Sequence, residues 1–104
     1  MDSGTYNNFQ SYLKDNYSHK FSWDVLSRCK RIENLLNIEL SNIQTQEDYI
    51  SIVKNLNKFI KTNLSNYHSK NSLQGTLLYS VRVFLKFKFG NKSKKIIKLR
   101  IMKK

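Results

Sequence analysis

The chain has 104 residues, enough for one domain and too few for two, and it can bury a modest core without a metal or disulfide. An apolar content of 39% with 12% aromatic residues argues against a disordered chain. The single cysteine excludes an intrachain disulfide. Because no segment resembles a signal peptide or a membrane span, we expect a cytoplasmic protein that does not contact membranes.

The net charge of +12 comes from the second half of the chain. Residues 1–48 carry five basic side chains and all seven acids, whereas residues 49–104 carry fourteen Lys and Arg and no acid. A solvated surface usually mixes charges of both signs, because charges of one sign repel one another. The acid-free half therefore predicts a polyanionic partner, with nucleic acid favoured and an acidic protein surface as the alternative.

Two helices are predicted in the first half. Residues 5–14 carry Phe9, Tyr12 and Leu13 at helical spacing, with Thr5 as the cap. After a polar break at residues 16–20, we expect Ser22 to cap a second helix. The apolar stripe of this second helix consists of Val25, Leu26, Cys29, Ile32, Leu35 and Leu36.

Two further helices are predicted in the second half. Residues 45–48 (TQED) resemble a capping box, and the helix that they start should end near Asn63. After a loop at residues 64–70, a fourth helix should run from residue 71 or 72 to about residue 88, with Gly90 as its stop. The apolar face of the fourth helix consists of Leu73, Leu77, Leu78, Val81, Phe84 and Leu85, and its other side of Gly75, Tyr79, Arg82 and Lys86.

The C-terminal segment allows more than one structure. Residues 85–89 and 97–101 alternate between apolar and basic, and residues 90–93 suit a turn, so a short β-hairpin is the alternative to helix. The longer helical pattern before residue 85 favours helix there, whereas the last ten residues stay open between strand, short helix and tail. We therefore predict an all-α fold, a compact four-helix bundle over residues 1–90 followed by a basic tail over residues 91–104.

The residues offer little for catalysis. His19 and His68 lie in polar segments, Cys29 lies in an apolar stripe, and the three glycines form no phosphate-binding loop. We therefore expect no enzyme, no catalytic residue, no metal, no cofactor and no small-molecule substrate.

Clustered Lys and Arg bind nucleic acid because each neutralised phosphate releases counterions. Lys54, Lys58 and Lys61 should lie along one helix side as point charges for phosphates. Arg82 can bind a phosphate or a guanine edge through two hydrogen bonds, beside Tyr79 and Lys86. The tail adds Lys94, Lys95, Lys98 and Arg100 as further candidate contacts.

Four segments together resemble the N-terminal SAM-like domain of phage integrases, the core-binding domain of tyrosine recombinases. They are residues 9–13 (FQSYL), 22–32 (SWDVLSRCKRI), 48–50 (DYI) and 80–87 (SVRVFLKF). The resemblance implies a SAM-like four-helix domain that clamps DNA, with Arg82 near the DNA. The catalytic residues of recombinases have no counterpart here, so it implies binding without recombination.

The leading hypothesis is a non-enzymatic module that contacts the phosphate backbone, with duplex DNA favoured over RNA. The alternatives are a small phage or mobile-element protein that inhibits a nucleic-acid-processing complex, as anti-defence proteins do, and an RNA-binding protein.

Overall fold

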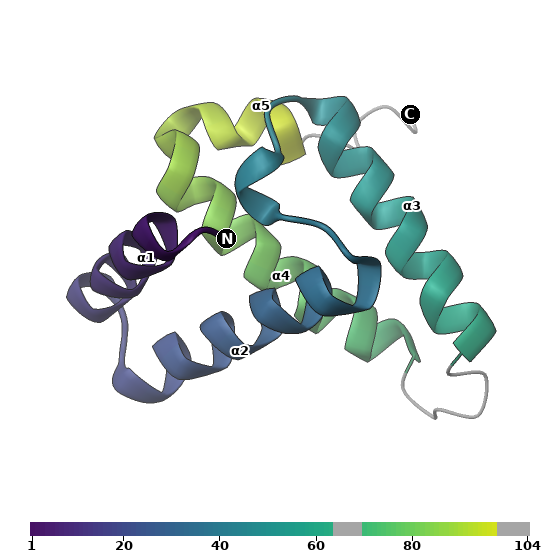
Figure 1. Cartoon of the computed structure of the whole chain (residues 1–104), viewed down its shortest axis with the longest axis horizontal. Coiled ribbons are helices and arrows are strands. Elements are labelled where there is room, and N and C mark those ends of the chain that lie inside the picture. Colours follow the sequence, from purple (N-terminus) through teal and green to yellow (C-terminus); the bar gives the residue numbers. More distant parts are fainter. Residues whose placement is uncertain (64–69, 98–104) are drawn as a thin grey trace.

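The computed structural model describes residues 1–63 and 70–97, and all of its regular elements are helical (Figure 1). This confirms the predicted all-α fold with four long helices. In chain order the elements are α1 (Ser3–Asn16), α2 (His19–Leu36), the 3-10 turn η1 (Leu40–Asn42), α3 (Gln46–Asn63), α4 (Lys70–Phe89), the 3-10 turn η2 (Gly90–Lys92) and α5 (Ser93–Ile97).

Helix α4 runs through the middle of the bundle and contacts α1, α2, α3 and α5 (Figure 1). Its predicted apolar face is buried from Leu77 to Leu85, and Val83 is buried as well. The ring of Phe84 packs edge-on against Phe9 of α1, with ring centroids 5.1 Å apart. The core therefore surrounds α4, and the other helices are arranged by their contacts with it.

Helices α2 and α4 approach each other closely at Cys29. The Cys29 thiol is fully buried and donates to the carbonyl oxygen of Ser80, with 3.4 Å between the two atoms. Burial raises the pKa of this thiol, because a thiolate would lose its hydration. Cys29 is thus a small core residue, as its position in the apolar stripe predicts.

The capping box at the start of α3 is confirmed. The Thr45 hydroxyl accepts from the Asp48 amide at 3.2 Å, and the Asp48 carboxylate accepts from the Thr45 amide at 3.1 Å. This carboxylate also accepts from the amide of Gln44 at 2.8 Å. Asp48 therefore satisfies two amides that would otherwise lack a partner at the entry to the helix.

The predicted caps of the first two helices are wrong. Asp2, not Thr5, caps α1, because its carboxylate accepts from the amide and the hydroxyl of Thr5. Ser18, not Ser22, caps α2 and accepts from the Phe21 amide at 3.2 Å. Ser22 is buried within the helix and donates to the Ser18 carbonyl oxygen instead. The earlier start places the Phe21 ring against Tyr17, with centroids 4.6 Å apart.

The end of α4 excludes the first of the two strands in the alternative β-hairpin. Residues 85–89 continue the helix to Phe89, so they form no strand, and Phe87 packs against Phe9 with ring centroids 5.1 Å apart. Helix α4 begins at Lys70, slightly earlier than predicted, and Gly90 stops it with φ of 61°. Residues 64–69, most of the predicted loop, and 98–101 of the other predicted strand lie outside the described residues.

The predicted tail needs correction at its start. Residues 91–97 form η2 and the short helix α5, which contacts α3 and α4. Ser93 and Ile96 are buried, because α5 places them against the two longer helices. This part of the predicted tail therefore belongs to the bundle.

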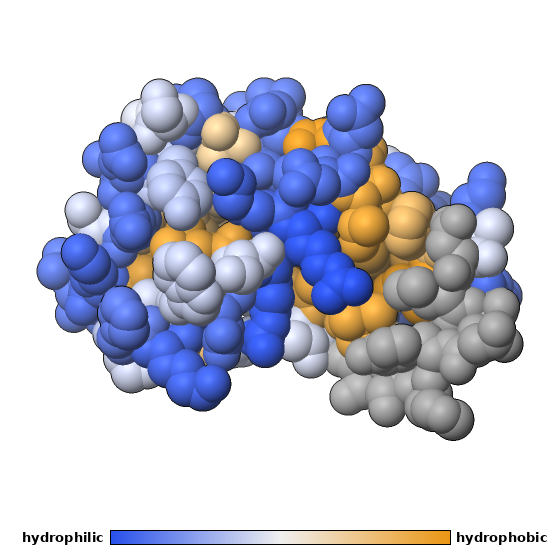
Figure 2. Space-filling model, turned by 60° about the horizontal axis from the view of Figure 1, so that its bottom comes forward, coloured by the Kyte–Doolittle hydropathy of each residue, from blue (hydrophilic) through white to orange (hydrophobic). Residues whose placement is uncertain are grey.

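The surface is largely hydrophilic. Figure 2 turns the lower side of Figure 1 forward and shows polar residues over most of this face, with apolar ones gathered mainly toward its right side. Among the described residues, the large hydrophobic side chains that are exposed are Trp23 and Tyr79. No helix in this part of the chain is long and apolar enough to cross a membrane.

Gly75 within α4 and Gly90 just after its end predict two opposite changes in stability. Gly90→Ala should lower the free energy of unfolding by about 1–2 kcal/mol, because a Cβ disfavours the left-handed backbone at this position. Gly75→Ala should raise it by about 0.5–1 kcal/mol, since the helix interior favours Ala and the added Cβ meets nothing within 4 Å. Urea denaturation followed by circular dichroism measures both, and shifts of the same sign would contradict this account.

The capping carboxylate predicts a loss of stability in acid. Hydrogen bonds from the Gln44 and Thr45 amides lower the pKa of Asp48, so its contribution is present above the unfolded-state pKa of about 4 and is lost as pH falls through the folded-state value. Asp48→Asn keeps an acceptor oxygen but cannot titrate. The melting temperature of this variant should lie below that of the wild type at neutral pH, and the two should converge in acid. If the melting temperatures of the two proteins differed by the same amount at every pH, Asp48 would not be responsible for the loss of stability in acid.

Candidate nucleic-acid interface

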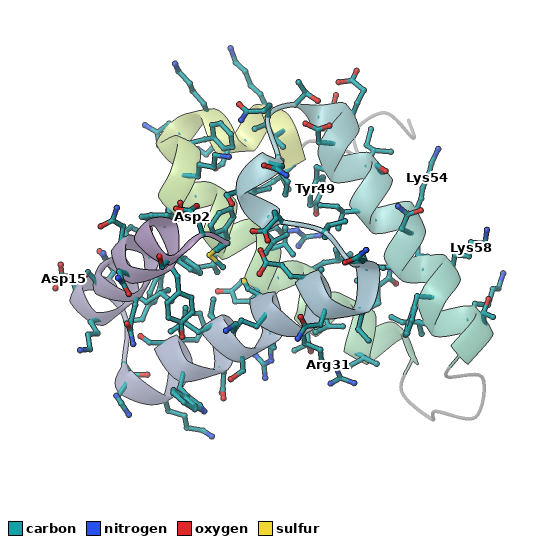
Figure 3. The ribbon with its side chains drawn as sticks, in the orientation of Figure 1. Asp2, Asp15, Arg31, Tyr49, Lys54 and Lys58 are labelled. Atoms are coloured by element: carbon teal, nitrogen blue, oxygen red, sulfur yellow. The ribbon has the colours of Figure 1, made fainter. Side chains whose placement is uncertain are left out.

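The predicted lysine stripe of α3 lies on the solvent side of the helix. The inner side of α3 buries Tyr49, Ile52, Leu56 and Ile60 against the core. Lys54, Lys58 and Lys61 are all exposed, and Figure 3 shows Lys54 and Lys58 projecting from the side of α3 turned away from α4. The helical spacing thus aligns three ammonium groups on one outer surface.

One side of helix α4 faces solvent along a stripe of Gly75, Tyr79, Arg82 and Lys86, which we call the α4 stripe. Gly75 and Lys86 are exposed, Tyr79 is 47% exposed and Arg82 is half-buried. The edge of the Tyr79 ring packs against Phe21 of α2, with centroids 6.1 Å apart. The structure therefore groups the three predicted α4 residues on one surface, apart from the lysine stripe of α3.

Arg82 joins α4 to α3 through a hydrogen bond that the sequence did not indicate. Its Nε donates to the hydroxyl of Tyr49, with 3.2 Å between the two atoms. Tyr49 is only 1% exposed, so its ring belongs to the core while its hydroxyl reaches the base of the α4 stripe. Periodicity alone places Tyr49 on the apolar face and gives no signal for this contact.

Two of the predicted tail contacts lie on α5. Lys94 and Lys95 are exposed, whereas their neighbours Ser93 and Ile96 face the core. They are therefore held on a helix packed against α3 and α4. Lys98 and Arg100, the other two predicted contacts, lie outside the described residues.

Lys88 is a basic residue with an internal role. Its ammonium group donates to the carbonyl oxygens of Ser41 and Ile43, the second at 3.0 Å, and so fastens the segment between α2 and α3 to α4. Burial lowers the pKa of Lys88, and the nearby Asp48 carboxylate opposes this shift. Lys86, two residues earlier, points to solvent instead.

Four of the seven acids of the first half are engaged by groups other than lysine or arginine side chains. Asp2 and Asp48 cap helices, and Glu33 and Glu39 form ion pairs with the amino group of Met1 at 2.5 and 2.6 Å. Burial disfavours the charged amino group, but hydrogen bonds to the two glutamates outweigh this and raise its pKa. Over residues 1–63 and 70–97, no carboxylate forms an ion pair with a Lys or Arg side chain.

The described residues present no candidate metal centre. Within them, no three His, Cys, Asp or Glu side chains lie close enough to hold a metal ion. His19 is exposed at the start of α2, and His68 lies outside the described residues. The expectations that the protein is not an enzyme and binds no cofactor stay predictions.

Comparison with known proteins adds no family assignment. The chain matches no model of a known protein family, and neither the curated proteins nor the solved structures give a match. The resemblance to the SAM-like domain of phage integrases therefore stays a prediction. What the fold and the surface define is an all-α bundle with separate basic surfaces on α3, α4 and α5.

The contrast between Lys88 and Lys86 gives a prediction about stability. Lys88→Met should lower the free energy of unfolding by about 1–3 kcal/mol, because two carbonyl oxygens lose their donor. Lys86→Met makes the same chemical change at an exposed position and should alter stability by less than about 0.5 kcal/mol. Urea denaturation of both variants provides the test, and equal losses would refute the internal role of Lys88.

Proposed function

We propose that this protein is a non-enzymatic module that binds the phosphate backbone of DNA through its basic surfaces. The contacts would come from the α3 lysines (Lys54, Lys58 and Lys61), the α4 stripe (Tyr79, Arg82 and Lys86) and α5 (Lys94 and Lys95). The observation that carries the proposal is that none of these basic side chains forms an ion pair with a carboxylate within the described residues.

This observation matters because the positive charge is not neutralised within the protein. A polyanion would relieve the repulsion among the lysines, and the counterions that it releases would favour binding. Lysines on outer helix surfaces suit phosphate contacts, which position a protein on DNA without reading its sequence. We therefore expect binding to duplex DNA with little sequence preference, and weaker binding to RNA.

The predicted resemblance to integrase domains supports the same chemistry, and such a module from a phage or mobile element would bind DNA without recombining it. The one described cysteine is a buried free thiol, which suits the reducing cytoplasm where we place the protein. If the chain instead inhibits a nucleic-acid-processing complex, a stoichiometric acidic protein should remain bound after nuclease treatment.

A charge-matched pair of triple variants tests the lysine stripe. The site variant replaces Lys54, Lys58 and Lys61 with Gln, and the control replaces the exposed Lys14, Lys20 and Lys30 of the first half with Gln. Both lose the same net charge, so only the placement of the lysines differs. If each α3 lysine contacts one phosphate, the site variant should lower the slope of log affinity against log salt by about 2.7, whereas the control keeps the slope.

The measurement is fluorescence anisotropy of a labelled duplex titrated from about 50 to about 200 mM NaCl. A single strand and an RNA duplex of the same sequence serve as competitors. The proposed function would be refuted if the wild type did not bind at low salt, or if its affinity did not change with salt concentration. Equal losses in the two triple variants would show that total charge matters and that the α3 stripe does not.

A further inference from the structure

Arg82 differs from the other basic residues of the proposed interface in being held in place. Lys54, Lys58, Lys61 and Lys86 are exposed to solvent. Arg82 is half-buried, and its Nε is bound to a hydroxyl group at 3.2 Å. That hydroxyl belongs to Tyr49, whose ring is fixed in the core.

The partner of Arg82 leaves its charge unneutralised. A carboxylate is the usual partner of a buried arginine, because a charge removed from water needs compensation. Here a neutral hydroxyl accepts one hydrogen bond, and no carboxylate in the described part of the chain forms an ion pair with Arg82. The contact with Tyr49 uses Nε alone, so among the described residues the two terminal nitrogens remain as donors for another acceptor.

The same contact decides between the two ligands that an arginine can bind through a pair of hydrogen bonds. A guanine edge lies inside the major groove, and a side chain must extend into the groove to reach it. The hydrogen bond to Tyr49 holds the Arg82 guanidinium close to α3, and the side chain is half-buried. A phosphate lies on the outside of the duplex, where a recessed guanidinium on a helix surface can meet it.

We propose that Arg82 binds one backbone phosphate through its two terminal nitrogens, and that Tyr49 is a positioning residue that orients it by accepting from Nε. This proposal rests on the proposed function and deepens it: the site recognises the phosphodiester and is indifferent to the base. A lysine at this position would supply the charge but not the paired donors.

The first arm of the test asks whether the guanidinium geometry matters. Arg82→Lys keeps the charge and should weaken binding about tenfold, the equivalent of one lost charge-assisted hydrogen bond. Arg31→Lys is the matched control, because Arg31 is exposed and Figure 3 shows it projecting from the lower side of α2. Its affinity should equal that of the wild type. Equal losses in both variants would overturn the proposal.

The second arm asks whether Tyr49 acts through Arg82. Tyr49→Phe removes only the hydroxyl and should weaken binding by about three- to tenfold with an unchanged salt slope, because no cation is lost. Arg82→Ala removes one cation and should lower the slope by about 0.9. The double variant Tyr49→Phe/Arg82→Lys should bind as Arg82→Lys does, because the hydroxyl has nothing left to orient. Additive losses, or wild-type affinity of Tyr49→Phe, would overturn the positioning role.

The third arm separates phosphate from base and does not depend on Tyr49→Phe folding well. The wild type and Arg82→Lys are compared on a duplex rich in G·C pairs and on one of alternating A·T pairs, with thermal melts confirming that both proteins are folded. The proposal expects the same fold-loss on both duplexes, whereas a loss confined to the G·C duplex would overturn it in favour of base recognition. Failure of the proposed function looks different, because the wild type itself would then show no salt-dependent binding.

Discussion

The burial of α4 is the constraint on which the other features of this protein depend. Four helices pack around it, and its contact with α2 is close enough for the Cys29 thiol to reach the carbonyl oxygen of Ser80. Such an approach requires small side chains on both helices, which explains a cysteine and a serine in the core. Between Leu77 and Lys86, Tyr79 and Lys86 are exposed and Arg82 is half-buried, so these three side chains form the part of this stretch that solvent reaches.

Most acids of the first half have a structural role, whereas most lysines of the second half have none among the described contacts. Four of the seven acids are occupied, two as caps for helix amides and two as partners of the Met1 amino group. Glu33 also accepts from the Leu40 amide at 2.8 Å, so it joins three parts of the chain. These four acids therefore serve the fold itself, within single turns at the caps and between distant segments at Glu33 and Glu39. The lysines of α3 and α5 serve no comparable purpose, which is why we look for their partner outside the chain.

Sequence periodicity predicted the helices because a helix that buries one side has apolar residues at every third or fourth position. The capping box at Thr45 was equally visible, since its two side chains are three residues apart. The caps Asp2 and Ser18 were missed because each competes with a second residue of suitable chemistry four residues or fewer away. Which candidate caps the helix depends on tertiary contacts, such as the packing of Phe21 on Tyr17, that local sequence does not contain.

Side-chain roles within one helix were harder to predict than the helix itself. Lys86 and Lys88 are the same residue type two positions apart, yet a rotation of about 200° separates a solvent-facing lysine from one that binds the loop before α3. Nothing in the sequence near Lys88 indicates the carbonyl oxygens of Ser41 and Ile43, because they come from a distant segment. The same holds for Arg82 and Tyr49, which only the packing of α3 on α4 brings together.

The choice of arginine at position 82 follows from that packing. A lysine carries its charge at the end of a flexible stem and has no second nitrogen to anchor, so a bond to Tyr49 would occupy the ammonium group itself. A guanidinium can give Nε to the hydroxyl and still present two donors outward. Lysine is the usual cation in this half of the chain, and Arg82 is the one arginine of α4. The proposed phosphate contact would explain this choice, because anchoring to Tyr49 and binding to phosphate would then use different nitrogens of one side chain.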